Sequence, residues 1–530
     1  MDRLELLERV LAGVAHQDVG AATDRAEAAV DDGDPAMAAV AAFAAFWAGN
    51  HDRAVELLRV EPADADACAI HTVVRGLVAA AVGERILGDP FAGMAEVVAP
   101  YATDDRWGAF VRYAAVEGAM ADARLSLAME LMPPGRPPYV VWAGHPYAGV
   151  MVACRARLDA FSGRIADAAR AFADAPREGA VGALLYATEA LVAGNAADPE
   201  TLDRCVGMVE SADLPTLDHL GRGVFLLVAF GAIAHGDTAL ATRCVIRAGG
   251  DAAMTPLTII DRLLSYELLV SVAVDAGDLD AARAWQQLAE HLDGERAAMP
   301  TLWRIRSRVR LLGGDPPGAE EAAQRAVELA RCEGRAVEAA EAEIVLARAR
   351  IAGTKVAEAT RDLREAVVEG DRTGHRAVRR SASRTLRTAG RRLPPVLGGG
   401  WESLSRREAE IAELMIAGGT NEAIASRLHL SVATVRVHAS RVLAAFGAAS
   451  RIGLLAAVND WPGSPVVPSD LTPRQADIVE RIAQGWSNQR IADDLGISVK
   501  AVENHVGEVL RRWGLEQRFA VALEWWSRQS

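Results

Sequence analysis

The C-terminal part of this chain contains one sequence pattern twice, 67 positions apart and without a gap. The first copy extends from Leu404 to Arg451 and the second from Leu471 to Arg518; 18 of the 48 aligned positions are identical. Apolar side chains recur in both copies at helical spacing and are interrupted by a glycine at the same place. A duplication of this kind predicts two consecutive helical domains with one fold.

Each copy begins with residues typical of a helix start. In the first copy, Ser405 and Glu408 have the spacing of a capping box. In this motif the side chain of each residue accepts a hydrogen bond from the backbone N–H of the other. In the second copy Thr472 and Gln475 take these places, with Pro473 at the first helical position, where proline is favoured. The sequence therefore predicts a first helix in each copy directly after residues 405 and 472.

A second and a third helix are expected to follow across a tight turn. In the first copy, Thr420 or Asn421 can cap the second helix, and Ser431 can cap the third. The second copy repeats this order, with Ser498 at the start of its third helix. Two helices joined by a three- to four-residue turn form a helix-turn-helix unit, whose second helix lies in the major groove of DNA.

These residues resemble the LuxR/FixJ-type (GerE-like) DNA-binding domain, a four-helix fold. The resemblance covers residues 404–458 and 471–527. The first copy matches nearly all of the family's pattern, at Glu408, Asn421, Ile424, Ser431, Thr434, Val435, Arg436, His438 and Arg451. The second copy departs from it at three places: Gln475, Ala501 and Glu503.

The resemblance implies a set of DNA-binding residues. Those expected to face the bases are Arg436, Val437 and Ser440 in the first copy, and Glu503, Asn504 and Gly507 in the second. Phosphate contacts are expected near Ser431, Thr434, Ser498 and Lys500. The set is completed by Asn421, Arg441, Arg451, Asn488, Arg511, Arg512 and Arg518.

The two copies differ at the position that should matter most for base recognition. Arg436 can donate two hydrogen bonds to a guanine, whereas Glu503 can only accept, for example from a cytosine amine, and it repels phosphate. Basic charge reappears in the second copy at Arg511 and Arg512, where the first copy has alanines. We therefore expect the copies to read different sequences or the second to bind weakly, the alternative being a structural or dimerising role for the second copy.

A fourth apolar segment follows each third helix, at residues 451–459 and 518–527. In the resembled family this helix forms the dimer interface. We expect the two copies to pair within one chain as a pseudo-dimer, with Trp525 and Trp526 buried against Leu454 and Leu455. The alternatives are two independent domains or a homodimer between chains.

Residues 1–392 repeat a different pattern, in which a helix ends at a small-residue turn and another helix follows at once. Four of these turns contain Gly236, Gly277, Gly314 and Gly353, which are 41, 37 and 39 residues apart. Glycine can end a helix in the left-handed conformation, and a following Asp or Asn can cap the next helix. This period resembles tetratricopeptide repeats and predicts an all-α solenoid of helical hairpins, the alternative being an irregular helical domain.

The expected organisation is a helical sensor or interaction domain at 1–392, a linker at 393–402, one LuxR-type domain at 403–460, a Pro-rich linker at 461–469 and a second LuxR-type domain at 470–530. Residues 375–392 hold seven arginines and no acid. They form either a solvated arginine face or a clamp on phosphates beside the first DNA-binding domain.

Several classes of function are excluded or disfavoured. The sequence has no G-x-x-x-x-G-K-[ST] nucleotide loop and no nucleophile elbow or zinc-protease motif, so neither an enzyme nor a cofactor is expected. Its five cysteines lie far apart, which disfavours a metal site and disulfides. The longest apolar run, near residues 35–49, is too short to span a bilayer, which needs about 20 residues. A cytoplasmic bacterial protein without membrane contact is expected.

The net charge of −14 is unusual for a DNA-binding protein, but it reflects mainly the long N-terminal part. Both copies are close to neutral, so their non-specific DNA affinity should be modest. The sequence predicts a sequence-specific transcriptional regulator that binds double-stranded DNA, with a protein, peptide or small-molecule effector on the solenoid and RNA polymerase as a further partner. The alternative is an interaction adaptor whose C-terminal copies serve mainly for dimerisation.

Overall fold

The computed structural model describes residues 3–30, 35–83, 87–132, 138–171, 175–212, 214, 217–391, 400–401, 404–459 and 468–529. Within these residues the chain is all-α, since every regular element is a helix and no strand occurs. The chain divides into two compact units, residues 1–392 (unit 1) and residues 393–530 (unit 2). The linkers expected at 393–402 and 461–469 lie almost entirely outside the described residues.

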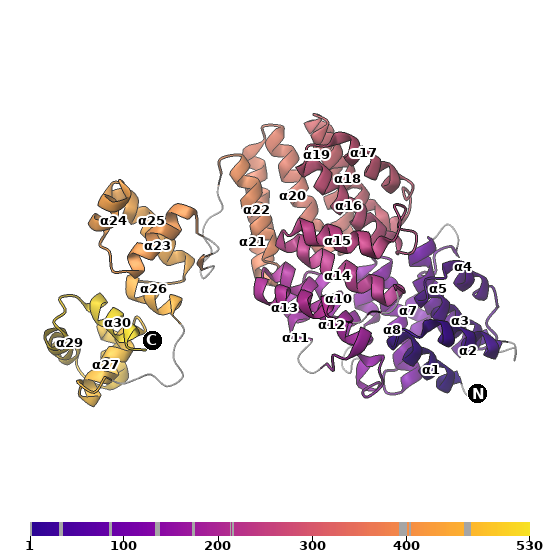
Figure 1. Ribbon diagram of the computed structural model, residues 1–530, viewed down its shortest axis with the longest axis horizontal. Helices are drawn as coiled ribbons and strands as arrows, with labels where there is room; N and C mark the ends of the chain where they lie inside the picture. The colour runs from indigo at the N-terminus through magenta and orange to yellow at the C-terminus, as the bar shows by residue number, and fades with distance from the viewer. Residues whose placement is uncertain are drawn as a thin grey trace. The chain divides into compact units, whose positions relative to one another are not determined.

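Unit 1 consists of helices joined by short turns (Figure 1). Its α-helices are α1 (Arg3–Ala15), α2 (Val19–Val30), α3 (Pro35–Trp47), α4 (His51–Leu57), α5 (Ala65–Val82), α7 (Met94–Val98), α8 (Arg106–Ala121), α9 (Leu125–Leu131), α10 (Ala148–Phe161), α11 (Ile165–Arg170), α12 (Gly179–Ala196), α13 (Pro199–Glu210), α14 (His219–His235), α15 (Thr238–Gly249), α16 (Ile259–Asp275), α17 (Leu279–Glu290), α18 (Met299–Leu312), α19 (Pro316–Cys332), α20 (Ala336–Ala352), α21 (Val356–Thr373) and α22 (Ala377–Thr388). Two short 3-10 helices are η1 (Pro138–Val140) and η2 (Arg296–Ala298).

The turns between paired helices follow the expected chemistry, with one correction. Gly236, Gly277 and Gly314 have φ values of 102°, 72° and 83°, in the left-handed region, and an aspartate directly after each caps the next helix. At the fourth turn the left-handed residue is Thr354, with φ 68°, whereas Gly353 has φ −79°. The prediction for Gly353 was wrong because α20 continues to Ala352, which places the glycine one position before the reversal of the chain.

Most neighbouring hairpins stack through the first helix of each pair, whereas the hairpin that begins with α16 is contacted by the preceding hairpin mainly through α15. The closest crossing is between α12 and α14, where a Cβ added to Gly194 would lie 2.0 Å from the carbonyl oxygen of Gly231. Only glycine allows two helix backbones to approach so closely. The result is a tight pair of inner helices in the middle of unit 1.

The stack of hairpins curls until helices far apart in sequence touch. Helix α14 contacts α3, α16 contacts α5, α20 contacts α10 and α22 contacts α12. One such contact is a hydrogen bond from Arg262 Nη2 to the carbonyl oxygen of Ala81, at 2.9 Å. A continuous apolar core runs from Leu6 to Val309 through this arrangement. Unit 1 therefore curls so that the inner faces of hairpins distant in sequence line a shared space.

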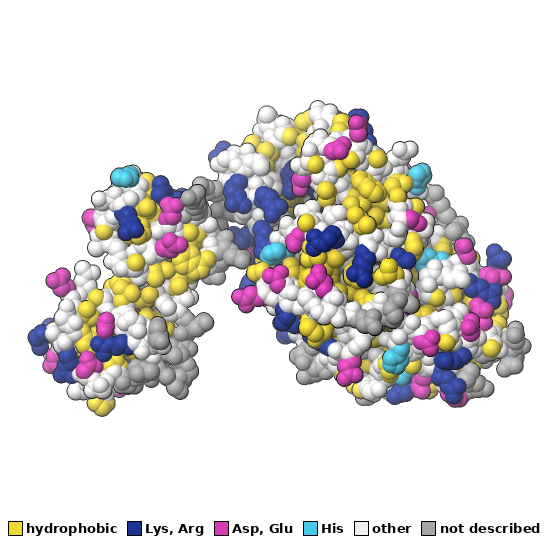
Figure 2. Space-filling view, viewed as in Figure 1, with side chains coloured by type: hydrophobic (Ala, Val, Ile, Leu, Met, Phe, Trp, Pro, Cys, Tyr) yellow, Lys and Arg dark blue, Asp and Glu magenta, His cyan; other side chains and the backbone are white. Residues whose placement is uncertain are grey.

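Part of the arginine-rich segment 375–392 is engaged within unit 1. Arg379 forms an ion pair with Asp371 at 2.5 Å, and Arg380 donates to the carbonyl oxygen of His235 at 2.5 Å. Lys and Arg side chains gather over the region of α21 and α22 in Figure 2. The phosphate-clamp hypothesis for this segment stays a prediction.

One described helix, α5, is long and apolar enough to cross a membrane by length and composition alone. Most of its residues are buried in the core of unit 1, including Ile70, Val74 and Leu77. It lies outside the long apolar run at residues 35–49.

Unit 2 contains two groups of four helices. The first comprises α23 (Arg406–Ile416), α24 (Asn421–Leu428), α25 (Val432–Ala445) and α26 (Arg451–Val458). The second comprises α27 (Pro473–Ala483), α28 (Asn488–Leu495), α29 (Val499–Trp513) and α30 (Arg518–Ser527). Equivalent helices begin 67 residues apart, so the sequence duplication is also a duplication of structure.

Candidate nucleic-acid interface

The predicted caps fix where the helices of the first copy begin. Ser405 and Glu408 form a capping box: the Glu408 N–H donates to Ser405 Oγ at 3.2 Å, and the Ser405 N–H donates to Glu408 Oε2 at 2.9 Å. Thr420, not Asn421, caps α24, and Ser431 caps α25. The turn between α24 and α25 passes through His429 in the left-handed conformation, with φ 54°. Together these features set α25 as the second helix of the helix-turn-helix unit.

One face of α25 is exposed and carries the residues expected to read bases. Arg436, Val437 and Ser440 are exposed, as is Arg441, which is expected to bind DNA without a base assigned to it; Val435, Ala439 and Val442 on the opposite face are buried. Arg436 forms no ion pair with any described residue. The side chain of Val437 is 54% exposed, which is unusual for valine. An exposed apolar group beside an arginine suits a thymine methyl next to a guanine.

The first turn of α25 offers hydroxyl groups and backbone N–H groups to a phosphate. Ser431 Oγ accepts from the Thr434 N–H at 3.0 Å, and the hydroxyls of Ser431 and Thr434 lie 2.8 Å apart. The positive end of the helix dipole is located here, which favours an anion. The expected phosphate contacts of these two residues stay a prediction.

Two of the predicted DNA-binding residues of the first copy bind each other. Arg451 donates to Asn421 Oδ1 at 2.7 Å and also to the carbonyl oxygen of Gly419, which ties the start of α26 to the start of α24. In the second copy Arg518 donates to the carbonyl oxygen of Trp486 at 2.5 Å. Asn488 Oδ1 is buried without a hydrogen-bond partner among the described residues. These arginines position helices, and their contact with DNA stays a prediction.

The second copy has the same frame with a different surface. Thr472 and Gln475 form its capping box, and Ser487 and Ser498 cap α28 and α29. On α29, Glu503 and Asn504 are exposed, and a Cβ added to Gly507 would meet nothing within 4 Å. The carboxylate of Glu503 lies 3.3 Å from Lys500 Nζ.

Charge is balanced over much of the second copy. Lys and Arg side chains alternate with Asp and Glu side chains on the face of this copy seen in Figure 2. Arg511 and Arg512 are both exposed at the end of α29, and Arg512 also donates to the carbonyl oxygen of Asp470. A surface of this kind neutralises few phosphates, so it should contribute little non-specific affinity.

A partly buried contact between the first and third helices differs between the copies, and sequence reasoning missed it. Glu408 Oε1 lies 3.4 Å from both His438 Nδ1 and Arg441 Nη1. Burial raises the pKa of Glu408, but hydrogen bonds from Ser405, His438 and Arg441 outweigh it and hold the pKa below its usual value.

In the second copy two of these three residues are replaced, and His505 keeps the place of His438. Gln475 stands in place of Glu408, and Glu508 stands in place of Arg441. The amide of Gln475 donates to Glu508 Oε2 at 2.9 Å. The second copy therefore has a glutamine where the first has Glu408, and a glutamate where the first has Arg441. The two differences match each other, and both are visible when the sequences of the two copies are aligned.

The two copies meet through their fourth helices. Helix α26 contacts α27 and α30. Trp525 and Trp526 are 2% and 7% exposed and share one apolar cluster with Leu455. The indole N–H of Trp526 donates to the carbonyl oxygen of Ala483 at 3.3 Å. Leu454 is also buried, but within the core of the first copy.

This contact is reciprocal. A Cβ added to Gly418 would lie 3.3 Å from Leu523 and 3.5 Å from Phe519, both on α30. The equivalent Gly485 faces the equivalent helix of the other copy, with Gly453 Cα at 3.0 Å from its added Cβ. Each glycine thus faces the fourth helix of the other copy. Such mutual contacts between equivalent residues are typical of a two-fold interface.

Comparison with known families agrees with the position of both copies. Residues 402–457 and 469–524 each match the family described as bacterial regulatory proteins, luxR family. No curated protein matches the chain. Unit 2 thus contains two LuxR-family helix-turn-helix domains, and at this level the chain is a DNA-binding transcriptional regulator.

Proposed function

We propose that the chain is a sequence-specific regulator in which unit 1 receives a signal and controls two DNA-reading domains. The observation that carries the proposal is the exposed face of α25, with Arg436, Val437, Ser440 and Arg441 on a helix capped by Ser431. Such a face combines a bidentate donor, an apolar group and a hydroxyl, the kinds of group that recognise base edges in the major groove.

The two domains act as an intramolecular pseudo-dimer. The reciprocal contacts of Gly418 and Gly485, together with the burial of Trp525 and Trp526, support this arrangement. The recognition helices differ at Arg436 and Glu503, so the proposed operator has two unequal half-sites at a fixed spacing. One chain then suffices for a complete site, whereas a homodimer would require four domains on the DNA.

The signal is a protein, a peptide or a small molecule that binds unit 1. It controls DNA binding only if it has different affinity for the states in which unit 2 can and cannot bind DNA. RNA polymerase is the further partner through which a bound regulator would change transcription in the cytoplasm.

The direct test is recovery and sequencing of genomic DNA bound by the purified full chain, at low and at moderate salt, beside Arg436→Ala. If Arg436 contacts a base, the variant should lose about 1–3 kcal/mol of specific binding. Arg407→Ala is the matched control, because Arg407 is an exposed arginine on α23 that is paired with Glu410.

The competing function is an interaction adaptor whose C-terminal copies only dimerise. A shared motif that is lost in Arg436→Ala and kept in Arg407→Ala supports the regulator. If neither the full chain nor the fragment 393–530 enriches any genomic DNA sequence, the result supports the adaptor. Enrichment by the fragment alone would mean that unit 1 holds the domains inactive until its signal arrives.

A further inference from the structure

The inner helices of unit 1 line a partly open cavity of about 320 Å³. Its walls come from the inner helices, α8, α10, α12, α14, α16, α18, α20 and α22, with Trp47 at the end of α3. Pockets for small molecules range from roughly 300 to 1,000 Å³. The cavity is therefore large enough for an organic ligand, and it lies where hairpins distant in sequence meet.

The cavity is elongated along α14. Residues of this helix from His219 to Ala234 border it. At about 1.5 Å per residue this is roughly 22 Å of helix. The bordering positions include His219, Gly223, Leu226, Phe230 and Ile233, which recur every three or four residues and so share one face. We call this elongated cavity the α14 channel.

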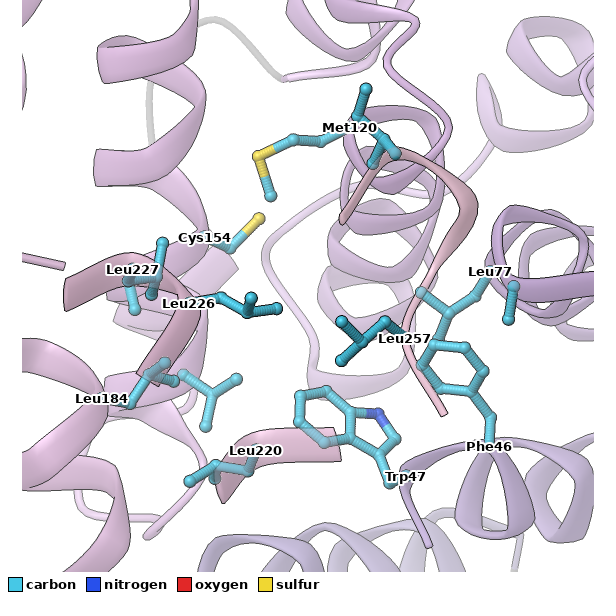
Figure 3. Close-up of a cluster of buried hydrophobic side chains, with 14 of the residues drawn as sticks. Phe46, Trp47, Leu77, Met120, Cys154, Leu184, Leu220, Leu226, Leu227 and Leu257 are labelled. Atoms are coloured by element: carbon cyan, nitrogen blue, oxygen red, sulfur yellow. The ribbon is translucent and has the colours of Figure 1, made fainter. Parts of the chain in front are cut away.

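The wall of the α14 channel is mostly apolar, and the buried ion pair of Arg157 and Glu117 also borders it. In Figure 3 the side chains of Trp47, Met120, Leu226 and Leu257 point from different helices and loops toward a common space. Gly223 widens it further, because a Cβ added there would meet nothing within 4 Å. The apolar part of this wall suits the hydrocarbon chain of an amphipathic ligand.

Arginines on α18, α20 and α22 gather where α14 ends. Arg304 is satisfied, since it binds Glu267 at 2.6 Å and Glu338 at 3.0 Å. Arg308 lies 3.3 Å from the same Glu267 and so shares a carboxylate that Arg304 already binds. Arg384 forms no ion pair with a described residue, and its guanidinium lies near Gly236 at the end of α14.

Arg348, like Arg384, forms no ion pair with a described residue. Its one hydrogen bond within the described chain joins Nε to Thr385 Oγ1 at 3.5 Å. Burial, and then the charge of Arg308, lower its pKa, although Glu341 and Asp275 compensate in part. A half-buried guanidinium without a close carboxylate gains most from a bound anion.

We propose that the α14 channel binds an elongated amphipathic anion, a long-chain carboxylate, with its chain along α14 and its carboxylate at Arg348 and Arg384. This inference rests on the proposed signal-receiving role of unit 1, for which it names the class of ligand. A bound chain would contact helices from both ends of the curled stack and so favour one state of it.

Filling the channel tests the site. Gly223→Leu places a side chain in open space on α14, and it should weaken binding of cis-parinaric acid, a fluorescent long-chain carboxylate, to the full chain at least tenfold. Gly207→Leu is the matched control, because Gly207 is a helical glycine on α13 that is exposed and also has open space around it. Equal binding by both variants, or no saturable binding by the unaltered chain, would overturn the proposal.

Charge tests the orientation. Palmitate should displace the probe at least tenfold more effectively than hexadecanol, which has the same chain without the carboxylate. Arg348→Gln should remove this difference, and Arg325→Gln should keep it, because Arg325 is exposed on α19 and paired with Glu328. If hexadecanol competes as well as palmitate with the unaltered chain, the anion end is assigned wrongly.

The readouts separate this inference from the proposed function. Probe binding is measured without DNA, so its absence contradicts the α14 channel and leaves the DNA-reading domains untouched. Bound palmitate that leaves the affinity of the full chain for its operator unchanged contradicts signal reception by unit 1. If palmitate changes the affinity of the unaltered chain for its operator but not that of Gly223→Leu, both the α14 channel and signal reception by unit 1 are supported.

Discussion

Glu503 determines how the second domain can differ from the first. It stands at the place of Arg436, is exposed, and lies 3.3 Å from Lys500 Nζ. Glu503→Arg replaces a hydrogen-bond acceptor by a donor. We therefore expect one half-site to prefer a different base, with a difference in binding free energy of about 1–3 kcal/mol between the new and the old base. The slope of log affinity against log salt should steepen by about 1. Selection from randomised DNA, followed by titrations at several salt concentrations, measures both.

The control for this prediction is Glu516→Arg, an equal change of charge at an exposed position after α29. It should steepen the salt dependence at most and leave the preferred bases as they are. If Glu503→Arg changes neither half-site, the second domain does not read a base at this position, and the structural role becomes the better account of it.

Buried histidines should make unit 1 sensitive to mild acid. Burial lowers the pKa of His375 to about 4 and that of His219 to about 3. In the unfolded chain their pKa is about 6.5, so below that pH the unfolded state takes up protons that the folded state does not. The folded state therefore loses stability from pH 6.5 downward, by about 2 kcal/mol per histidine at pH 5.

Urea unfolding of residues 1–392 at pH 7 and pH 5 measures this loss, and His375→Gln should reduce it by about 2 kcal/mol. The ion-paired Glu338 contributes outside this window: burial raises its pKa, but Arg335 and Arg304 hold it at about 2, so its protonation matters only below about pH 4.5. The same pH dependence in His375→Gln and in the unaltered chain would contradict the assignment.

At the scale of elements, the exchanged contact between the first and third helices predicts a rescue. Gln475→Glu places a second carboxylate beside Glu508, which is now a hydrogen-bond partner at 2.9 Å. Two carboxylates at that distance repel each other, so unfolding of the fragment 393–530 should become about 1–2 kcal/mol easier at pH 7. Adding Glu508→Arg recreates the pair of the first domain and should restore the stability, as a urea titration can show.

Local chemistry explains which elements were predictable. The capping residues Ser405, Ser431, Thr472 and Ser498 can be predicted from sequence because a cap joins residues only three positions apart. Gly353 was misjudged by a single residue, since the exact end of a helix depends on packing as well as on composition. The partner of Gln475 lies 33 residues away, and only the alignment of both copies could have revealed it.

Contacts distant in sequence explain what was not predictable. The predicted hairpins of unit 1 carry no sign that α14 meets α3 or that α12 meets α22. The α14 channel exists only because these contacts bring its helices together. Its position, and the grouping of its arginines, therefore could not be predicted from the sequence. The DNA-reading face, in contrast, lies within one helix, so its residues could be named before any fold was known, although Arg451 and Asn421 turn out to bind each other.

At the scale of the whole molecule, the interface between the two domains should fix the spacing of the half-sites. Ala456 on α26 packs against the apolar cluster of the second domain, whereas the next residue, Ala457, is exposed. Ala456→Glu buries a charge in that interface, while Ala457→Glu adds the same charge to the surface. We expect the first variant to tolerate base pairs inserted between the half-sites and to bind the intact operator about tenfold more weakly, because tethering by a linker alone leaves the two domains unoriented.

The second variant should keep both the affinity and the spacing preference of the unaltered chain. Affinity for isolated half-sites should be the same in all three proteins, since α25 and α29 lie outside the interface. Binding to a series of operators lengthened one base pair at a time measures the preference. A strict spacing that survives Ala456→Glu would mean that the domains are oriented by another contact, such as one between two chains, and sedimentation of the protein on its operator would then find two chains where the pseudo-dimer requires one.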